Sequence, residues 1–322
     1  MSLPSSPRFP PIEPYASGML DVGGGHTIYW EACGNPAGEA ALYLHGGPGG
    51  GCGTGARRFF DPGRYRIVLL DQRGSGRSRP LASELTTNLA ENTTGHLIAD
   101  IEELRRHLGV DTWTILGVSW GTTLALAYAR AHRDRVRAMV LALVTTTSRR
   151  EVAWMTQGVA PIFPREWERF SSAVPSHLAH LPLVDAYAEL LADPDAAVRE
   201  HAAREWCAWE DAHVSLAPDF APNPQFQDAE FRFRFARLVT HYWRHAAFLD
   251  DEILIRDSGY LIDLPGVLIH GRFDVSGPLE TAWRLHRAWP SSQLVILDDV
   301  GHGAGESFPG AVTAALSGLP RR

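Results

Sequence analysis

Residues 117–121 read Gly-Val-Ser-Trp-Gly, with a serine held between two glycines where an apolar run ends. This is the G-x-S-x-G pattern, in which a sharp turn between a strand and a helix lifts the serine hydroxyl above the backbone. The glycines are needed because neighbouring backbone packs too closely for a side chain. Residues 113–118 predict a strand and residues 120–131 a helix, which is the context that gives this common pattern weight. We therefore expect Ser119 to be a nucleophile rather than part of a structural turn.

A nucleophilic serine needs a base that takes its proton and an acid that orients the base. In enzymes with this sharp turn, called the nucleophile elbow, the acid and then the histidine follow the serine along the chain. Asp274 follows the predicted strand 266–270, and His302 follows the predicted strand 294–298. Both fall at the carboxyl ends of strands, where the sites of parallel sheets gather. We predict that Asp274 fixes the tautomer of His302 and that His302 deprotonates Ser119.

Other residues compete for these two roles. Asp298 and Asp299 are alternative acids, but both stand directly before the turn that carries the histidine and are expected to cap or solvate it. His270 lies inside a predicted strand and His286 on a predicted helix, so neither suits a base carried by a loop. The order along the chain and the positions at strand ends favour the first assignment.

A glycine-rich segment follows the short predicted strand 42–44. Residues 45–51 read His-Gly-Gly-Pro-Gly-Gly-Gly, which allows backbone N–H groups to approach a ligand. A phosphate nest is the alternative, but the segment lacks the lysine of a G-x-x-x-x-G-K-[ST] loop. As an oxyanion hole the segment complements the elbow, with one N–H from Gly47 (or Gly46) and the other from Trp120.

Residues 71–78 read Asp-Gln-Arg-Gly-Ser-Gly-Arg-Ser and follow the predicted strand 67–71. Their Gly-Ser-Gly sequence predicts a second tight loop near the same edge of the sheet. We expect Asp71 and Arg73 to pair and to brace the site without taking part in the chemistry.

Strands and helices alternate in the two end portions of the chain. The predicted strands are apolar on both faces, which indicates a mostly parallel sheet with helices on both faces, that is, an α/β fold. The predicted strands cover 27–33, 42–44, 67–71, 113–118, 137–143, 266–270 and 294–298, and the predicted helices cover 96–108, 120–131, 279–288 and 307–317.

The pattern changes in the middle of the chain. Residues 151–250 contain no convincing strand and several helical stretches that are broken by prolines. We predict a catalytic domain formed by residues 1–145 and 251–322, with an all-helical cap inserted at residues 146–250. The many aromatic side chains of the cap are expected mainly to pack its helices, with one or two lining an apolar pocket.

The overall composition excludes several classes of protein. The chain has 322 residues and a net charge of −7, and no cluster of Lys or Arg suggests a nucleic-acid or anionic-membrane surface. Three cysteines without C-x-x-C spacing provide neither a disulfide framework nor a zinc site. No apolar run of about 18 residues predicts a membrane span, and the N-terminal residues do not resemble a signal peptide. We expect a cytoplasmic protein.

Four motifs together resemble the prolyl aminopeptidases, or proline iminopeptidases, of the α/β-hydrolase fold. They are H-G-G-P-G-G-G at 45–51, D-Q-R-G-S-G-R-S at 71–78, E-N-T-T at 91–94 and G-x-S-W-G at 117–121. Residues 12–15, 270–274 and 301–302 also match, so the resemblance covers nearly the whole chain. It implies a serine enzyme that removes an N-terminal residue, usually proline, without a metal or other cofactor. It also implies a catalytic triad and an oxyanion hole made by Ser119, Asp274, His302, Gly47 and Trp120.

The resemblance further implies carboxylates in the cap that hold the free α-ammonium group of the substrate. Trp209-Glu210 matches the W-E pair that carries one of them, and Gly46 is expected to face the substrate beside it. The second carboxylate is expected in a segment such as A-R-I-E-N-H-Y. Residues 236–242 read Ala-Arg-Leu-Val-Thr-His-Tyr, so Val239 stands where that glutamate is expected, and Glu210 alone or with Glu230 is left to hold the amine.

Three functions are therefore compared. The first is a peptidase that cleaves an N-terminal residue, with proline preferred, from a small peptide through an acyl-enzyme. The second, suggested by Val239, is an esterase or amidase of the same fold that acts on an apolar acyl group or a small molecule without a free amine. The third is a binding module without catalysis, which the intact order of serine, aspartate and histidine disfavours.

Overall fold

The computed structural model describes residues 8–214, 216, 220–302 and 305–321. Eight strands form one sheet in the order β1-β2-β4-β3-β5-β6-β7-β8. The pairs β1–β2 and β2–β4 are antiparallel, and all the other neighbours are parallel. The strands are β1 (Ala16–Asp21), β2 (Thr27–Gly34), β3 (Glu39–Leu44), β4 (Tyr65–Leu70), β5 (Trp113–Val118), β6 (Val136–Ala142), β7 (Gly266–Gly271) and β8 (Ser292–Leu297).

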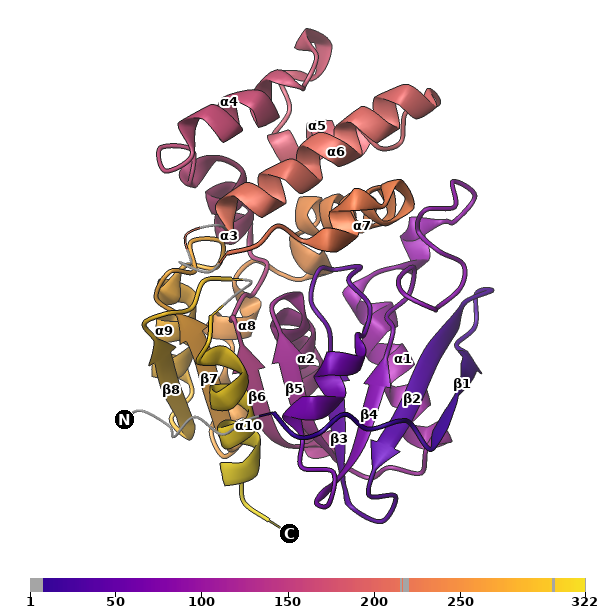
Figure 1. The fold of residues 1–322 in the computed structure, drawn as a ribbon, viewed down its shortest axis with the longest axis vertical. Coiled ribbons are helices and arrows are strands. Elements are labelled where there is room, and N and C mark those ends of the chain that lie inside the picture. Colours follow the sequence, from indigo (N-terminus) through magenta and orange to yellow (C-terminus); the bar gives the residue numbers. More distant parts are fainter. Residues whose placement is uncertain (1–7, 215, 217–219, 303–304, 322) are drawn as a thin grey trace.

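Helices cover both faces of this sheet (Figure 1). Successive side chains of a strand enter two different cores, since Leu42 belongs to one apolar cluster and Ala41 to the other. The first cluster includes side chains from α1 (Thr94–His107), α2 (Trp120–Ala131), α8 (Ile253–Arg256) and α9 (Leu279–Ala288). The second includes side chains from α10 (Phe308–Gly318) and the short helix Thr54–Phe59. The predicted α/β fold with a mostly parallel sheet is confirmed.

Local sequence signals explain where these elements begin and end. The predicted helix 96–108 begins as α1 at Thr94, because the side chain of Thr93 accepts the N–H of His96 at the N-cap. Strand β1 was not predicted from the sequence. It is an edge strand whose residues alternate between half-buried and exposed, so it lacks the apolar run that marks the central strands.

The segment between β6 and β7 contains only helices and loops in the part that the structure describes. It lies over the sheet edge where the parallel strands end (Figure 1). Besides α8, its α-helices are α3 (Arg149–Ala153), α4 (Pro164–Ser172), α5 (Leu183–Leu190), α6 (Ala196–His213) and α7 (Ala229–Arg244). Single turns cover Leu89–Glu91 and Arg133–Arg135 elsewhere, and Trp154–Gly158, Ser176–Leu178, Pro224–Gln227, Ala246–Phe248 and Gly259–Leu261 in or near this segment.

Aromatic side chains hold these helices together. Phe170 of α4 stacks on Tyr187 of α5, with ring centroids 4.6 Å apart, and on Trp209 of α6 at 5.2 Å. Trp206 meets the same ring edge-on, and it also packs on Trp243 of α7. This fixed packing means that α6 presents a defined face to the sheet below. None of the described helices is long and apolar enough to cross a membrane.

Candidate active site

Ser119 lies at the sharp turn between β5 and α2. Its φ of 54° and ψ of −125° are rare for a residue other than glycine, and surrounding contacts hold this conformation. The N–H of Ser119 donates to the carbonyl of Ala142, at a distance of 2.9 Å. A Cβ at Gly121 would lie 2.0 Å from the carbonyl oxygen of Leu44, and one at Gly117 would lie 2.5 Å from that of Gly121. The two glycines are therefore required by the close approach of the backbone.

The structure brings Ser119, His302 and Asp274 into one chain of hydrogen bonds. Ser119 Oγ lies 2.8 Å from His302 Nε2, and His302 Nδ1 lies 2.9 Å from Asp274 Oδ2. The other carboxylate oxygen of Asp274 accepts the N–H of Gly277 at 2.8 Å. Since an ionised Asp274 only accepts, the histidine proton lies on Nδ1, and Nε2 is left as an acceptor for the serine hydroxyl.

Charges around these hydrogen-bonded residues favour the imidazolium form of His302. Burial opposes ionisation of Asp274, but the neighbouring His302 keeps the pKa of Asp274 below its usual value. Burial also opposes the charged form of His302, yet Asp274 and Glu210 together raise its pKa above 6.5. A base whose protonated form is stabilised in this way is suited to removing the serine proton.

The rival acids and both rival histidines have other partners, and His286 Nδ1 contacts Ser292 Oγ at 2.8 Å. Asp298 pairs with Arg272 on the surface at 2.9 Å, and Asp299 accepts the N–H and the hydroxyl of Ser307. His270 Nδ1 accepts a backbone N–H, at a distance of 3.0 Å, so its Nε2 carries the proton and donates to a backbone carbonyl. Both nitrogens of His270 are occupied, so it has no free lone pair with which to act as a base.

Trp120 follows Ser119 in the chain, and Gly47 lines the same cavities as Ser119. Trp120 is the first residue of α2, where the helix leaves N–H groups without internal acceptors. Gly47 has a φ of 116°, and a Cβ there would lie 2.6 Å from the nitrogen of Gly49. Within the described residues, neither N–H has a protein acceptor. Both are available to an oxygen that carries negative charge.

Gln72 ties the glycine-rich segment to the elbow. Its side-chain oxygen accepts the indole N–H of Trp120 at 2.8 Å, and its side-chain nitrogen donates to the carbonyl of His45 at 3.0 Å. The indole N–H of Trp120 is therefore occupied, and only its backbone N–H is left for the site. Gly46 packs directly on Ser119, since a Cβ there would lie 3.1 Å from Ser119 Cβ.

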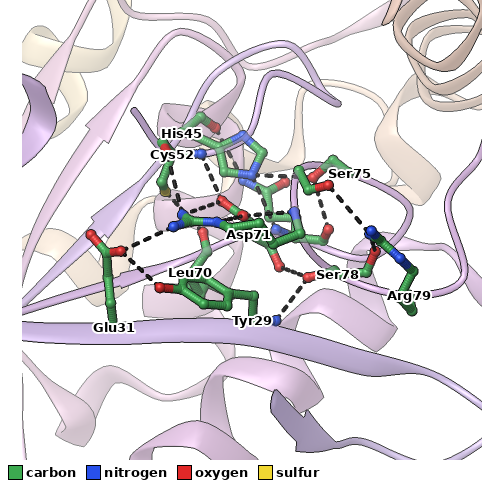
Figure 2. A network of polar contacts seen from close by, with 12 residues as sticks. Tyr29, Glu31, His45, Cys52, Leu70, Asp71, Ser75, Ser78 and Arg79 are labelled. Atoms are coloured by element: carbon green, nitrogen blue, oxygen red, sulfur yellow. Dashed lines mark hydrogen bonds and ion pairs between the residues drawn. The ribbon is translucent and has the colours of Figure 1, made fainter. Parts of the chain in front are cut away.

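The expected pairing of Asp71 with Arg73 is wrong. Asp71 accepts the N–H of Cys52 at 2.7 Å and pairs with Arg77 at 2.7 Å, whereas Arg73 pairs with Asp100. Figure 2 shows Asp71 at the centre of this network. The loop turns back at Gly74 and Gly76, which both have positive φ. Because of this turn, Arg77 reaches back to Asp71, while Arg73 reaches α1. The pair still braces the glycine-rich segment, because Cys52 ends it.

Two cavities meet at the serine and share Gly47, Ser119, Glu210 and His302 in their linings. The inner cavity, of about 40 Å³, is otherwise lined mostly by buried residues: Trp120, Thr145, Thr147, Met155, His213, Trp243, Ser276 and Gly277. The outer cavity, of about 380 Å³, is otherwise lined mostly by residues that are partly exposed: Asp211, Val214, Phe220, Ala221, Asn223, Pro224, Phe226 and Phe235.

Glu210 is the carboxylate that lines both cavities. Its Oε1 accepts the indole N–H of Trp206 at 3.1 Å. Burial raises the pKa of Glu210 to about 7, although His302 and Trp206 favour its ionised form. Val239 of α7 is fully buried and lines neither cavity, while Trp243, one turn later, lines the inner one. Glu230 is exposed and accepts the hydroxyl of Ser83 instead.

Two further residues at the inner cavity were not identified from the sequence. His213 lies three residues after Glu210 on α6, and Ser276 lies two residues after Asp274. The i, i+3 spacing on a helix was a signal for the first, because it places both side chains on one face.

No group of three or more His, Cys, Asp or Glu in the described part of the chain could hold a metal ion.

Comparisons with known proteins give a consistent result. Residues 42–309 match a family described as the alpha/beta hydrolase fold. The chain is 50% identical over 317 residues to a probable proline iminopeptidase of Streptomyces coelicolor, which covers 97% of this chain and 98% of that protein. It is 46% identical over 300 residues to the proline iminopeptidase of Xanthomonas citri, which covers 92% and 94%. A solved proline iminopeptidase structure from Mycobacterium smegmatis, with 19% identity, a TM-score of 0.62, and coverage of 94% and 98%, has the same fold.

Proposed function

The chain belongs to the proline iminopeptidases of the α/β-hydrolase fold, and we propose that it is a serine hydrolase that releases an N-terminal residue, with proline preferred, through an acyl-enzyme. The observation that carries this proposal is the position of Glu210. Its side chain is 14% exposed and lines the same two cavities as the hydrogen-bonded serine, where its carboxylate would hold a cationic amine.

In this proposal Ser119, His302 and Asp274 perform acyl transfer. His302 Nε2 takes the hydroxyl proton while Ser119 Oγ attacks the carbonyl carbon, and Asp274 stabilises the imidazolium that forms. The N–H groups of Gly47 and Trp120 donate to the oxyanion, and one such donor typically contributes about 2.7–4 kcal/mol to the transition state. The imidazolium then protonates the leaving amine. Water, deprotonated by His302, hydrolyses the acyl-enzyme and restores the serine.

Glu210 would confer the preference for a free N-terminus. A pyrrolidine ring in the inner cavity would contact Trp120, Met155 and Trp243, while the rest of the peptide leaves through the wider outer cavity. The ammonium group would then lie next to Glu210 and favour its ionised form. The helical residues 146–250 act as a cap in this proposal, because α6 closes the inner cavity and leaves no room for a residue before the proline.

The esterase alternative rested on Val239 in place of a second carboxylate. Because the Val239 side chain lines neither cavity, it does not argue against a substrate with a free amine. The lining of the inner cavity supports the peptidase, since an apolar acyl group would bring no positive charge to the carboxylate of Glu210.

The proposal is tested with proline 4-nitroanilide and its N-acetyl derivative. We expect turnover of the free amine and at least 100-fold slower turnover of the acetylated compound. The Ser119→Ala variant, which should not react with a fluorophosphonate, measures the uncatalysed background. Equal or faster hydrolysis of the acetylated compound by the unmodified enzyme would overturn the proposal.

A further inference from the structure

His213 has a buried nitrogen that no protein group satisfies. It lies at the end of α6, its side chain is only 2% exposed, and it lines the inner cavity together with Ser119. Within the described residues, His213 Nε2 has no hydrogen-bond partner. Leaving a buried polar atom unpaired is energetically unfavourable, because it has lost its hydrogen bonds to water. Such an atom at a cavity wall therefore points to a ligand that pairs with it.

The hydrogen bonds of Ser276 provide an assignment of the tautomer of His213. Ser276 Oγ donates its single proton to the backbone carbonyl of His213, at a distance of 3.1 Å. His213 Nδ1 lies 2.7 Å from the same oxygen, and with the Ser276 proton on the carbonyl we assign Nδ1 as the donor in that contact. The remaining nitrogen, Nε2, then carries a lone pair and no hydrogen. Its missing partner is a donor.

A second acceptor faces the same space. Glu210 Oε2 lies 3.6 Å from His213 Nε2, and the other oxygen of Glu210 is occupied by Trp206. When Glu210 is ionised, no hydrogen lies between these two acceptors, so they repel each other. A cationic group that carries two N–H bonds and enters between them would satisfy both.

The protonated secondary amine of an N-terminal proline has two N–H bonds. We propose that one of them donates to Glu210 Oε2 and the other to His213 Nε2, so that His213 is a specificity-determining residue for substrates with a free prolyl amine. This inference rests on the proposed function, because it assigns a residue to the recognition step of that reaction.

A neutral acceptor suits this position for electrostatic reasons. Burial and, to a smaller extent, the nearby His302 lower the pKa of His213 to about 3. The imidazole therefore stays uncharged at neutral pH and does not repel a cation. One ammonium group and one carboxylate form a neutral pair, whereas a second carboxylate here would leave a net negative charge buried near Asp274.

The test compares binding of small amides as competitive inhibitors of 4-nitrophenyl cyclopentanecarboxylate hydrolysis. This ester has no amine, so the assay does not depend on peptidase activity. We expect the His213→Leu variant to bind L-prolinamide about 10- to 100-fold more weakly than the unmodified enzyme, because a hydrogen bond to a charged group is lost. Binding of cyclopentanecarboxamide should change less than about threefold. Met155→Leu, which changes an apolar side chain of the same cavity, should not alter the ratio between the two amides.

N-methyl-L-prolinamide sharpens the test, because its ammonium form has a single N–H. The unmodified enzyme should bind it about tenfold more weakly than L-prolinamide, and His213→Leu should bind the two about equally. Equal inhibition by L-prolinamide in the unmodified enzyme and in His213→Leu would overturn the inference. An equal loss of affinity for L-prolinamide and cyclopentanecarboxamide in His213→Leu would also overturn it. These outcomes are distinct from failure of the proposed function, which would appear as no hydrolysis of proline 4-nitroanilide.

Discussion

The two sides of the inner cavity differ in how their polar groups are satisfied. On the side of the sheet, Ser119, His302 and Asp274 form an unbroken chain of hydrogen bonds, and Asp274 uses both of its oxygens. On the side of α6, Glu210 Oε2 and His213 Nε2 have no donor in the described part of the chain. In the proposed reaction, the three groups on the sheet side are thus oriented before a substrate arrives, whereas Glu210 and His213 gain their donors from the substrate.

The largest expected effect comes from breaking the chain of hydrogen bonds on the sheet side of the cavity. Asp274→Asn should reduce kcat for proline 4-nitroanilide about 10⁴-fold, because an amide can donate to His302 Nδ1 and favour the wrong tautomer. Fluorophosphonate labelling of Ser119 should slow in parallel. Asp298→Asn is the matched control, since that carboxylate lies on the surface, and it should retain kcat within about twofold. A loss of less than tenfold in Asp274→Asn would contradict the assignment.

A smaller effect is expected on the side that the substrate completes. Glu210→Gln should lower kcat/KM for proline 4-nitroanilide about 100-fold or more, because a buried charge pair is lost. Hydrolysis of 4-nitrophenyl cyclopentanecarboxylate should stay within about threefold. Asp211→Asn, which changes the adjacent carboxylate of the outer cavity, should affect neither substrate strongly. A parallel loss for both substrates in Glu210→Gln would place Glu210 with the catalytic groups and remove the contrast.

The smallest effect is on the stability of the free enzyme. The pKa of Glu210 is about 7 in the folded protein and 4.5 as its ordinary value. As the pH rises through this interval, the unfolded chain loses the proton first, so stability present below pH 4.5 is lost by about pH 7. The difference amounts to about 3 kcal/mol at most. In urea unfolding, Glu210→Gln should therefore gain stability relative to the unmodified enzyme between pH 5 and pH 8. A constant difference across that range would contradict the raised pKa.

The elements that carry the site follow from local patterns in the sequence. Residues 113–118 and 120–131 were predicted as a strand and a helix, and the structure has β5 and α2 with these bounds. The positions of Asp274 and His302 after two further strands followed from the same reasoning, because apolar runs of β7 and β8 are visible without knowledge of the fold. The antiparallel edge strand β1 gave no such signal, since half of its residues are exposed.

The pairing of side chains between distant segments was beyond this reasoning. Ser276 and His213 are 63 residues apart, and only the packing of α6 on the sheet brings them together. In the same way, the pairing of Asp71 with Arg77 depends on how a loop turns at its glycines. The prominence of Val239 came from a resemblance between sequences, which does not show whether a side chain faces a cavity or the core.

The order of the sheet has a consequence for how the enzyme is made. Strand β5, which leads to Ser119, pairs with β3 and β6, so this half of the sheet is assembled from nearby segments. Strands β7 and β8 join only after the whole helical segment, and Ser119 is 183 residues from His302. Such distant contacts form late and slow folding. During synthesis on the ribosome, Ser119 therefore leaves the ribosome long before His302, and its hydroxyl stays without the proposed base until that last part of the chain has emerged.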